Sequence, residues 1–158
     1  ICTHDDRLLV MAPPAFHAQL SSRIADLPPL LQALQEWMGG IGVPAPAARD
    51  VNLMLDELIT NIVLHGYEGR TDGWLEVEAE ARGASLLLTL RDRAPAFDPR
   101  AAPWPDATSP LEQRPIGGLG LMFVRRLADA MDYRRYTTTE GSEVNELRLT
   151  RHFAQPAV

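Results

Sequence analysis

Apolar residues recur at helical spacing in three stretches of the chain. The first stretch begins after Asp26, which we expect to cap a helix with Pro28 and Pro29 in its first turn. The second covers residues 46–65 and is closed by glycines. The third opens in the segment "GGLGL", and its apolar positions are Leu121, Val124, Leu127, Ala128 and Met131. We therefore expect three helices, each with one apolar face for packing.

Five further stretches favour β-strands. Apolar and polar positions alternate over residues 74–81, and an apolar run at residues 86–90 follows a short turn, which is typical of a hairpin. The other expected strands cover residues 16–24, 133–138 and 143–150. Strands grouped as hairpins favour a mixed, mainly antiparallel sheet with the helices on one face. The prediction is an α+β fold, a two-layer α/β sandwich.

The 158 residues suffice for one domain with its own core. Residues 93–115 are rich in proline and show no periodic pattern, so we expect a long loop. Loops of this length in a compact domain usually serve as lids or binding segments. We expect an N-terminal extension at residues 1–14, one domain at residues 15–152 and a C-terminal tail at residues 153–158.

Charge and composition narrow the classes of function. The formal net charge of −6 argues against a protein that grips nucleic acid, because phosphate binding needs a basic surface. It does not argue against nucleotide binding, where backbone N–H groups and a metal can hold the phosphates. The one cysteine, Cys2, excludes an internal disulfide. Without a long apolar run or a signal-peptide pattern, the chain is expected to be cytoplasmic, with no membrane and no direct nucleic-acid partner.

Two polar residues, Glu57 and Asn61, lie within the apolar second helix. At four residues apart they project side by side, away from the apolar face, and His65 follows one turn later. A carboxylate and a carboxamide offer hard oxygen ligands, which suit Mg²⁺. A solvent-facing polar stripe would give the same pattern. His65 is expected to be structural or to lie at the rim of a pocket.

Asp92 ends the apolar strand that begins at residue 86. A carboxylate buried there needs a partner, since an unpaired buried charge is costly. The exocyclic amino group of a purine is one such partner. Aspartate is also common as a cap or turn residue, so this position alone leaves both interpretations open.

A group of glycines, Gly117, Gly118 and Gly120, lies where the long loop becomes the third helix. Backbone N–H groups at a helix N-terminus form an anion site, and glycine permits close approach of phosphate oxygens. The segment lacks the Walker lysine and does not follow a strand in a βαβ unit. Neither a P-loop nor a Rossmann fingerprint therefore fits.

Taken in order, three segments resemble the nucleotide-binding motifs of the GHKL superfamily, the Bergerat-fold (HATPase_c) ATP-binding domains. These segments are "DELITNIVLHGYE", "DRAPAFDP" and "GGLGLMFVRRLADAMDYRR". Within the superfamily, the chain is most similar to the small anti-sigma factor serine/threonine kinases of bacterial partner-switching systems. The resemblance covers roughly residues 15–152.

The resemblance implies a role for each motif residue. Glu57 is expected to be the general base, and Asn61 to ligate Mg²⁺ beside the nucleotide. Asp92 is expected to recognise the adenine amino group, with Ala94 next to it, and residues 98–115 to form the ATP lid. The residues expected against the triphosphate are Gly117, Gly118, Leu119, Gly120 and Leu121.

The resemblance also implies an activity and partners. Such a kinase transfers the γ-phosphoryl group of ATP, with Mg²⁺, to a serine on an anti-anti-sigma factor (a STAS domain), and it silences a sigma factor. A homodimer is a further expectation. The histidine-kinase branch is disfavoured, because 158 residues leave no room for a phosphoacceptor helix hairpin. Two alternatives stay open: a non-catalytic ATP- or ADP-binding module that sequesters a partner, and an unrelated α+β protein with an accidental glycine turn.

One position departs from the family pattern. The second motif usually has glycine two residues after the aspartate, and this chain has Ala94 there. If that position requires positive φ, alanine strains the turn by roughly 1 kcal/mol or more.

Nucleotide binding separates the unrelated protein from the other two hypotheses, and phosphate transfer separates the kinase from the module.

Overall fold

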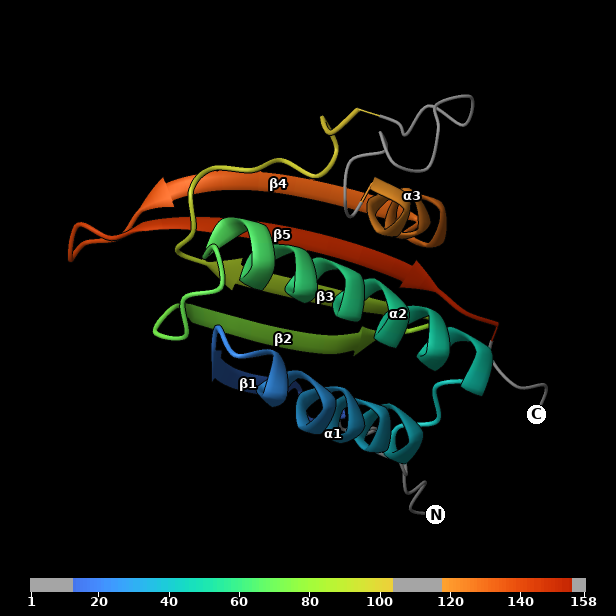
Figure 1. Ribbon diagram of the computed structural model, residues 1–158. Coiled ribbons are helices and arrows are strands. Elements are labelled where there is room, and N and C mark those ends of the chain that lie inside the picture. Colours follow the sequence, from blue (N-terminus) through green and yellow to red (C-terminus); the bar gives the residue numbers. More distant parts are fainter. Residues whose placement is uncertain (1–12, 104–117, 155–158) are drawn as a thin grey trace, which may run out of the picture.

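A computed structural model describes residues 13–103 and 118–154 of the chain. Within these residues, three α-helices cover one face of a five-stranded sheet (Figure 1). The elements in chain order are β1 (Phe16–Ser21), a 3₁₀ turn (Ile24–Asp26), α1 (Leu27–Gly40), α2 (Ala45–Asn61), a π-helical turn (Ile62–Gly66), β2 (Trp74–Arg82), β3 (Ser85–Asp92), α3 (Gly118–Leu127), β4 (Ala130–Thr137) and β5 (Glu143–His152).

The strand order in the sheet is β1-β2-β3-β5-β4, and all four neighbouring pairs are antiparallel. β5 lies between β3 and β4. Because β3 and β5 are antiparallel, the end of β3 is paired with the start of β5. In this register Asp92 is opposite Asn145. The predicted two-layer α+β architecture is confirmed, and the sheet has no parallel pair among the described strands.

The core lies between the sheet and the helices. Alternation along β2 buries Leu75, Val77 and Ala79 on the helix side and turns the intervening glutamates to the other face. α2 crosses the middle of the sheet, and its apolar stripe is buried there as the spacing predicted (Figure 1). None of the described helices combines the length and the hydropathy that crossing a bilayer requires.

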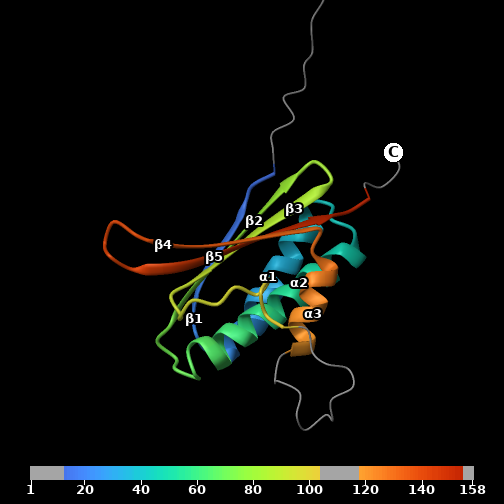
Figure 2. The ribbon, with the colours of Figure 1, turned by 90° about the horizontal axis from the view of Figure 1, so that it is seen from above.

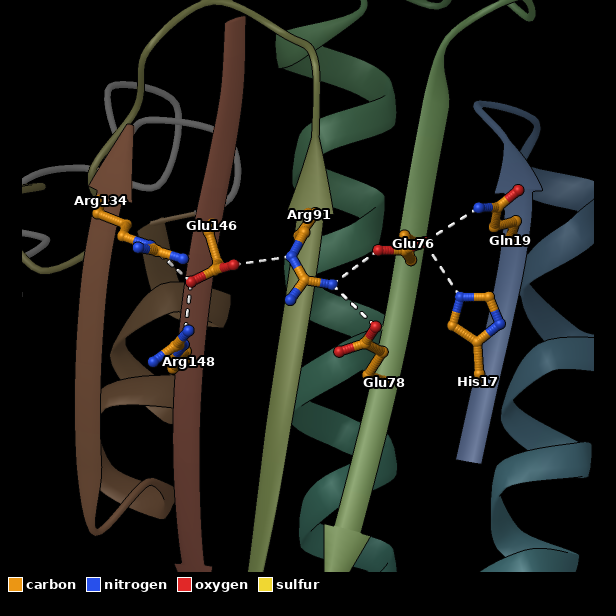
Figure 3. Close-up of polar contacts among 8 residues, drawn as sticks. All are labelled: His17, Gln19, Glu76, Glu78, Arg91, Arg134, Glu146 and Arg148. Carbon is orange, nitrogen blue, oxygen red and sulfur yellow. Dashed lines mark hydrogen bonds and ion pairs between the residues drawn. The ribbon is translucent and has the colours of Figure 1, made fainter. Parts of the chain in front are cut away.

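All described helices lie on one face of the sheet, and the other face carries a polar network (Figures 2 and 3). The carboxylate of Glu146 accepts hydrogen bonds from Arg91 Nε and Arg134 Nε, both at 2.7 Å, and pairs with Arg148 at 2.9 Å. Arg91 extends the network to Glu76 at 2.7 Å. A solvated face is ordinary for an antiparallel sheet, provided that its polar groups are satisfied.

Two expectations about the first elements were wrong. The first strand ends at Ser21 rather than near Ile24, which opens the 3₁₀ turn. Asp26 stands at the N-cap position of α1, but its side chain makes no capping hydrogen bond. The reason is that its carboxylate accepts hydrogen bonds from Ser21 Oγ at 3.0 Å and Arg23 Nε at 3.3 Å.

Two boundaries later in the chain also differ from the expectation. The helix expected over residues 46–65 ends as α-helix at Asn61 and continues as one π-helical turn. The third helix ends at Leu127, so Met131 belongs to β4. The hydrogen bond from Asp129 N to Thr150 O, at 2.8 Å, draws the chain into the sheet at this point. Residues 104–115 of the expected lid, most of the expected extension and most of the expected tail lie outside the described residues.

Candidate functional site

A cavity of about 420 Å³ lies between the C-terminal end of α2 and the neighbouring ends of β3, β5 and β4. Its size and mainly apolar lining are typical of a small-molecule site, where a few polar groups set the orientation of the ligand. The lining residues are Leu58, Asn61, Ile62, His65, Gly66, Leu90, Asp92, Ala94, Pro95, Ala96, Phe97, Pro99, Ala102, Pro103, Leu121, Tyr133, Asn145 and Leu147.

Asn61 and Glu57 occupy different positions relative to this cavity. Asn61 is the last residue of α2 and lines the cavity. Glu57, one turn earlier, is half-buried, and its carboxylate lies against Gly120 of α3. A methyl group at position 120 would overlap that carboxylate, so glycine lets α3 approach α2 closely here.

Asp92 lies at the end of β3 and is 6% exposed. Its Oδ1 accepts hydrogen bonds from Asn145 Nδ2 at 2.8 Å and from the backbone N–H of Ala94 at 2.9 Å. Burial raises the pKa of the Asp92 carboxyl, although both hydrogen bonds and Arg135 act in the opposite direction. Because both bonds end on Oδ1, Oδ2 is the carboxylate oxygen that remains for a ligand.

The turn after Asp92 is not strained. Within the described residues, Glu68 is the one residue other than glycine with positive φ, so Ala94 does not adopt the left-handed conformation. The condition under which alanine would destabilise this turn is therefore not met. Ala94 is buried and lines the cavity beside Asp92.

The glycine segment is described only in part. Gly117 lies outside the described residues, whereas Gly118 is the first residue of α3. Leu119 is exposed, and Leu121 is buried and lines the cavity. The first turn of α3 thus borders the same cavity as Asn61 and Asp92, so the three motifs that are far apart in the sequence meet at one place.

Two functional candidates were missed by the sequence analysis. Asn145 bonds Asp92 from the opposite strand, and its one local signal was a polar residue at a core-facing position before Leu147 and Leu149. Arg125 of α3 donates to the carbonyl of Pro99 from Nε at 2.9 Å, and to that of Ala102. No local pattern distinguished Arg125 from its neighbour Arg126.

Comparison with known proteins assigns the family. Residues 20–151 match the histidine kinase-like ATPase domain. The chain belongs to this family. Family membership implies an ATP site. It is also consistent with the sequence analysis, in which the three motifs resemble those of ATP-binding domains. The match covers most of the chain, including every described element that borders the cavity.

The chain is similar to named relatives that include a serine-protein kinase and an anti-sigma factor. It is 31% identical over 93 residues to the serine-protein kinase RsbW of Listeria monocytogenes, a match covering 56% of this chain and 59% of the relative. It is 35% identical over 49 residues to the anti-sigma F factor of Clostridium beijerinckii, covering 31% of this chain and 34% of the relative. The matched region thus spans about three fifths of the Listeria kinase and one third of the Clostridium protein.

A solved structure supports the fold of the ATPase domain. The RsbU and RsbW domains of Rv1364c from Mycobacterium tuberculosis align with 91% of this chain and 34% of that chain, with a TM-score of 0.60 and 22% identity. At this identity the likeness shows the fold alone. The α+β sandwich predicted from the sequence is therefore found both in the chain and in a structural neighbour.

The residues at the cavity fit Mg²⁺ and a nucleotide. Asn61 brings an amide oxygen to the cavity, and the Glu57 carboxylate lies one helical turn earlier on α2. Hard oxygen ligands in small number are what Mg²⁺ accepts when phosphate and water complete its shell. The apolar walls of the cavity suit the flat base of a nucleotide, and the first turn of α3 offers backbone N–H groups to its phosphates.

Proposed function

We propose that the protein is an anti-sigma factor serine kinase. It binds ATP with Mg²⁺, phosphorylates a serine on an anti-anti-sigma (STAS) partner and sequesters a sigma factor. The observation that carries the proposal is the meeting of three groups around one cavity: the buried Asp92, the amide of Asn61, and the first turn of α3. The names of the relatives, a serine-protein kinase and an anti-sigma factor, support the same activity.

The nucleotide is held along the cavity in this proposal. Asp92 accepts a hydrogen bond from the adenine amino group at the buried end. The backbone N–H groups at the start of α3, at Gly118 and Leu119, face the phosphates, where the helix dipole favours negative charge. Asn61 would hold Mg²⁺, which neutralises charge on the phosphate oxygens when bound.

The chemical step needs one proton acceptor. The serine oxygen of the partner attacks the γ-phosphorus, the bond from that phosphorus to the β–γ bridging oxygen breaks, and ADP leaves. Glu57 takes the proton of the serine hydroxyl as the new bond forms, directly or through a water. Phosphoryl transfer depends mainly on positioning and charge neutralisation, so one base, one metal ligand and a helix N-terminus suffice.

A second candidate function is a non-catalytic ATP- or ADP-binding module that sequesters a protein partner. The position of Glu57 favours it, because its carboxylate lies against Gly120 and Glu57 is not among the residues that line the cavity. The kinase requires that this carboxylate reach the incoming serine. The module requires only the cavity.

Replacement of Glu57 by glutamine separates the two functions. The change removes the proton acceptor and keeps the size of the side chain, so transfer to the STAS partner is expected to fall by roughly 10²–10⁴-fold with little change in ATP affinity. Transfer is measured as phosphoserine on the partner after incubation with ATP and Mg²⁺, and affinity is measured by calorimetric titration.

Asp56→Asn is the matched control for this experiment. Asp56 is the neighbouring carboxylate on α2, is half-buried like Glu57, and does not line the cavity. The Asp56→Asn variant is expected to transfer phosphate at the wild-type rate. Wild-type transfer by Glu57→Gln would remove Glu57 from the chemistry. ATP binding without transfer by the wild-type protein would favour the non-catalytic module.

A further inference from the structure

Asn145 is a buried polar residue at a strand position that otherwise faces the apolar core. It lies on the helix side of β5, where the next two alternate positions are the buried Leu147 and Leu149. Asn145 is 5% exposed and lines the cavity. A buried amide is costly unless it is hydrogen-bonded, so its partners indicate why it is kept there.

The amide nitrogen of Asn145 is directed at the turn that carries Asp92. Nδ2 donates to Asp92 Oδ1 at 2.8 Å, to the carbonyl of Ala94 at 3.0 Å, and to that of Pro95 at 3.3 Å. One side chain from β5 therefore holds both the carboxylate and the backbone of the following turn.

The amide oxygen fixes which way the side chain is turned. Oδ1 of Asn145 accepts from Tyr133 Oη at 2.7 Å and from Arg135 Nη1 at 2.8 Å. A guanidinium can only donate, so the oxygen of the amide must face Arg135. The nitrogen then has to face Asp92, and the orientation is set by the chemistry of both sides.

We propose that Asn145 is a specificity-determining positioning residue that fixes the Asp92 carboxylate for recognition of an adenine base. By occupying Oδ1, it leaves Oδ2 as the acceptor for the exocyclic amino group of the base. Guanine presents a carbonyl oxygen in place of that amino group, and an oxygen facing a carboxylate is repelled. The inference rests on the proposed ATP site and adds the residue that sets its choice of base.

The hydrogen bond from Asn145 also favours the ionised form of the Asp92 carboxylate. Burial raises the pKa of Asp92, and the hydrogen bond from Asn145 lowers it. Loss of that bond lets the pKa rise further, so binding that needs the ionised carboxylate is lost at a higher pH as the solution is acidified. The other charged or polar groups that act on Asp92 or line its cavity are Arg135, Tyr67, Tyr133 and His65. Their side chains remain in an Asn145 variant, but Arg135 and Tyr133 lose the acceptor Asn145 Oδ1.

The test is the ratio of ATP to GTP affinity, measured by calorimetric titration of the full chain with Mg²⁺. Asn145→Ala is expected to lower the ratio roughly tenfold or more, since a hydrogen bond to a charged group is lost. The loss of ATP affinity on acidification is expected to begin at a higher pH than in the wild-type protein. Asn145→Leu, which matches Leu147 and Leu149 on the same strand face, is the second variant if the alanine variant does not fold.

Two controls distinguish positioning of Asp92 from a general loss of structure. Asn52→Ala removes an asparagine of α2 that donates a hydrogen bond to Gln35 and does not line the cavity. This variant is expected to keep the wild-type ratio of ATP to GTP affinity. In an Asp92→Asn background, Asn145→Ala is expected to lower the ratio no further, because the acceptor that it positions is already gone.

The outcomes separate the inference from the proposed function. A wild-type protein that binds neither nucleotide would contradict the proposed ATP site itself. A wild-type protein that prefers ATP, with the same ratio and pH profile in the folded Asn145 variants, would overturn the role of Asn145 and leave the ATP site standing. An equal loss from Asn145→Ala in the Asp92→Asn background would also overturn it.

Discussion

Gly66 and Ala94 fit against each other where the π-helical turn after α2 meets the turn after β3. A Cβ on Gly66 would lie 2.9 Å from the Cβ of Ala94, closer than two carbon atoms pack. The family motif has glycine at the position of Ala94, and here the methyl group occupies space that Gly66 leaves open. Because neither residue has positive φ, close packing and not backbone strain limits this pair.

Gly66→Ala is therefore expected to destabilise the protein by about 1–3 kcal/mol, the usual cost of overpacking. The free energy of unfolding in urea measures the effect. The double change Gly66→Ala with Ala94→Gly is expected to recover most of the loss, since it moves the methyl group from one side of the contact to the other. Gly40→Ala is the control, because a Cβ there meets nothing within 4 Å. Equal effects of Gly66→Ala with and without Ala94→Gly would contradict the fit.

At the scale of elements, α3 does more than begin with a glycine-rich turn. Arg125, in the last turn of the helix, holds the loop that follows β3 through the carbonyls of Pro99 and Ala102. Both of these loop residues line the cavity. One helix therefore borders the cavity with its first turn and anchors one of the cavity walls with its last.

Arg125→Ala is expected to weaken ATP binding roughly tenfold, because a cavity wall loses hydrogen bonds that a charged donor supplies. Amide hydrogen exchange in residues 100–102 is expected to become faster. Arg126→Ala is the matched control: it removes the same charge from the next position of α3, where the side chain is exposed. If the two variants bind ATP equally well and exchange alike, Arg125 does not anchor the wall.

Local patterns predicted the elements better than the contacts between them. The helical spacing around Leu55 and the alternation along β2 each have one period, so both elements were predicted close to their bounds. The end of α3 was missed because its apolar pattern continues to Met131, whereas strand pairing of β4 with β5 decides where the helix stops. Asn145 and Arg125 were missed for the same reason: their partners come from other elements, 53 and 26 residues away.

At the scale of the whole molecule, the two faces of the sheet have different tasks. The helix face holds the core and the cavity, and the other face holds a polar network that reaches from Gln19 of β1 to Arg134 of β4 (Figure 3). Glu146 is the centre of this network and is 1% exposed. Burial alone would raise the pKa of its carboxyl, but its three arginine partners lower that pKa to about 2. The network thus joins all five strands through two carboxylates, Glu76 and Glu146, with Arg91 between them.

Because the pKa of Glu146 is lower in the folded state, its contribution to stability is present above about pH 4.5 and is lost as the pH falls towards 2. Glu146→Gln is expected to lower the free energy of unfolding by about 1–3 kcal/mol at neutral pH. The expected loss is modest because two of the arginines, Arg134 and Arg148, are largely exposed and solvent screens their charges. Urea denaturation of both proteins from pH 7 to pH 2 measures the difference, which should shrink below pH 4.5. A difference that stays constant with pH would contradict the assignment.

Calorimetric titration of ATP into the protein in the presence of Mg²⁺ shows whether the cavity beside Asp92 and Asn61 binds ATP. We expect saturable binding of one ATP per chain, weakened by Asn61→Ala only when Mg²⁺ is present, and lost in Asp92→Ala. Absence of saturable binding to the folded wild-type protein, or unchanged binding in folded Asp92→Ala, would contradict it.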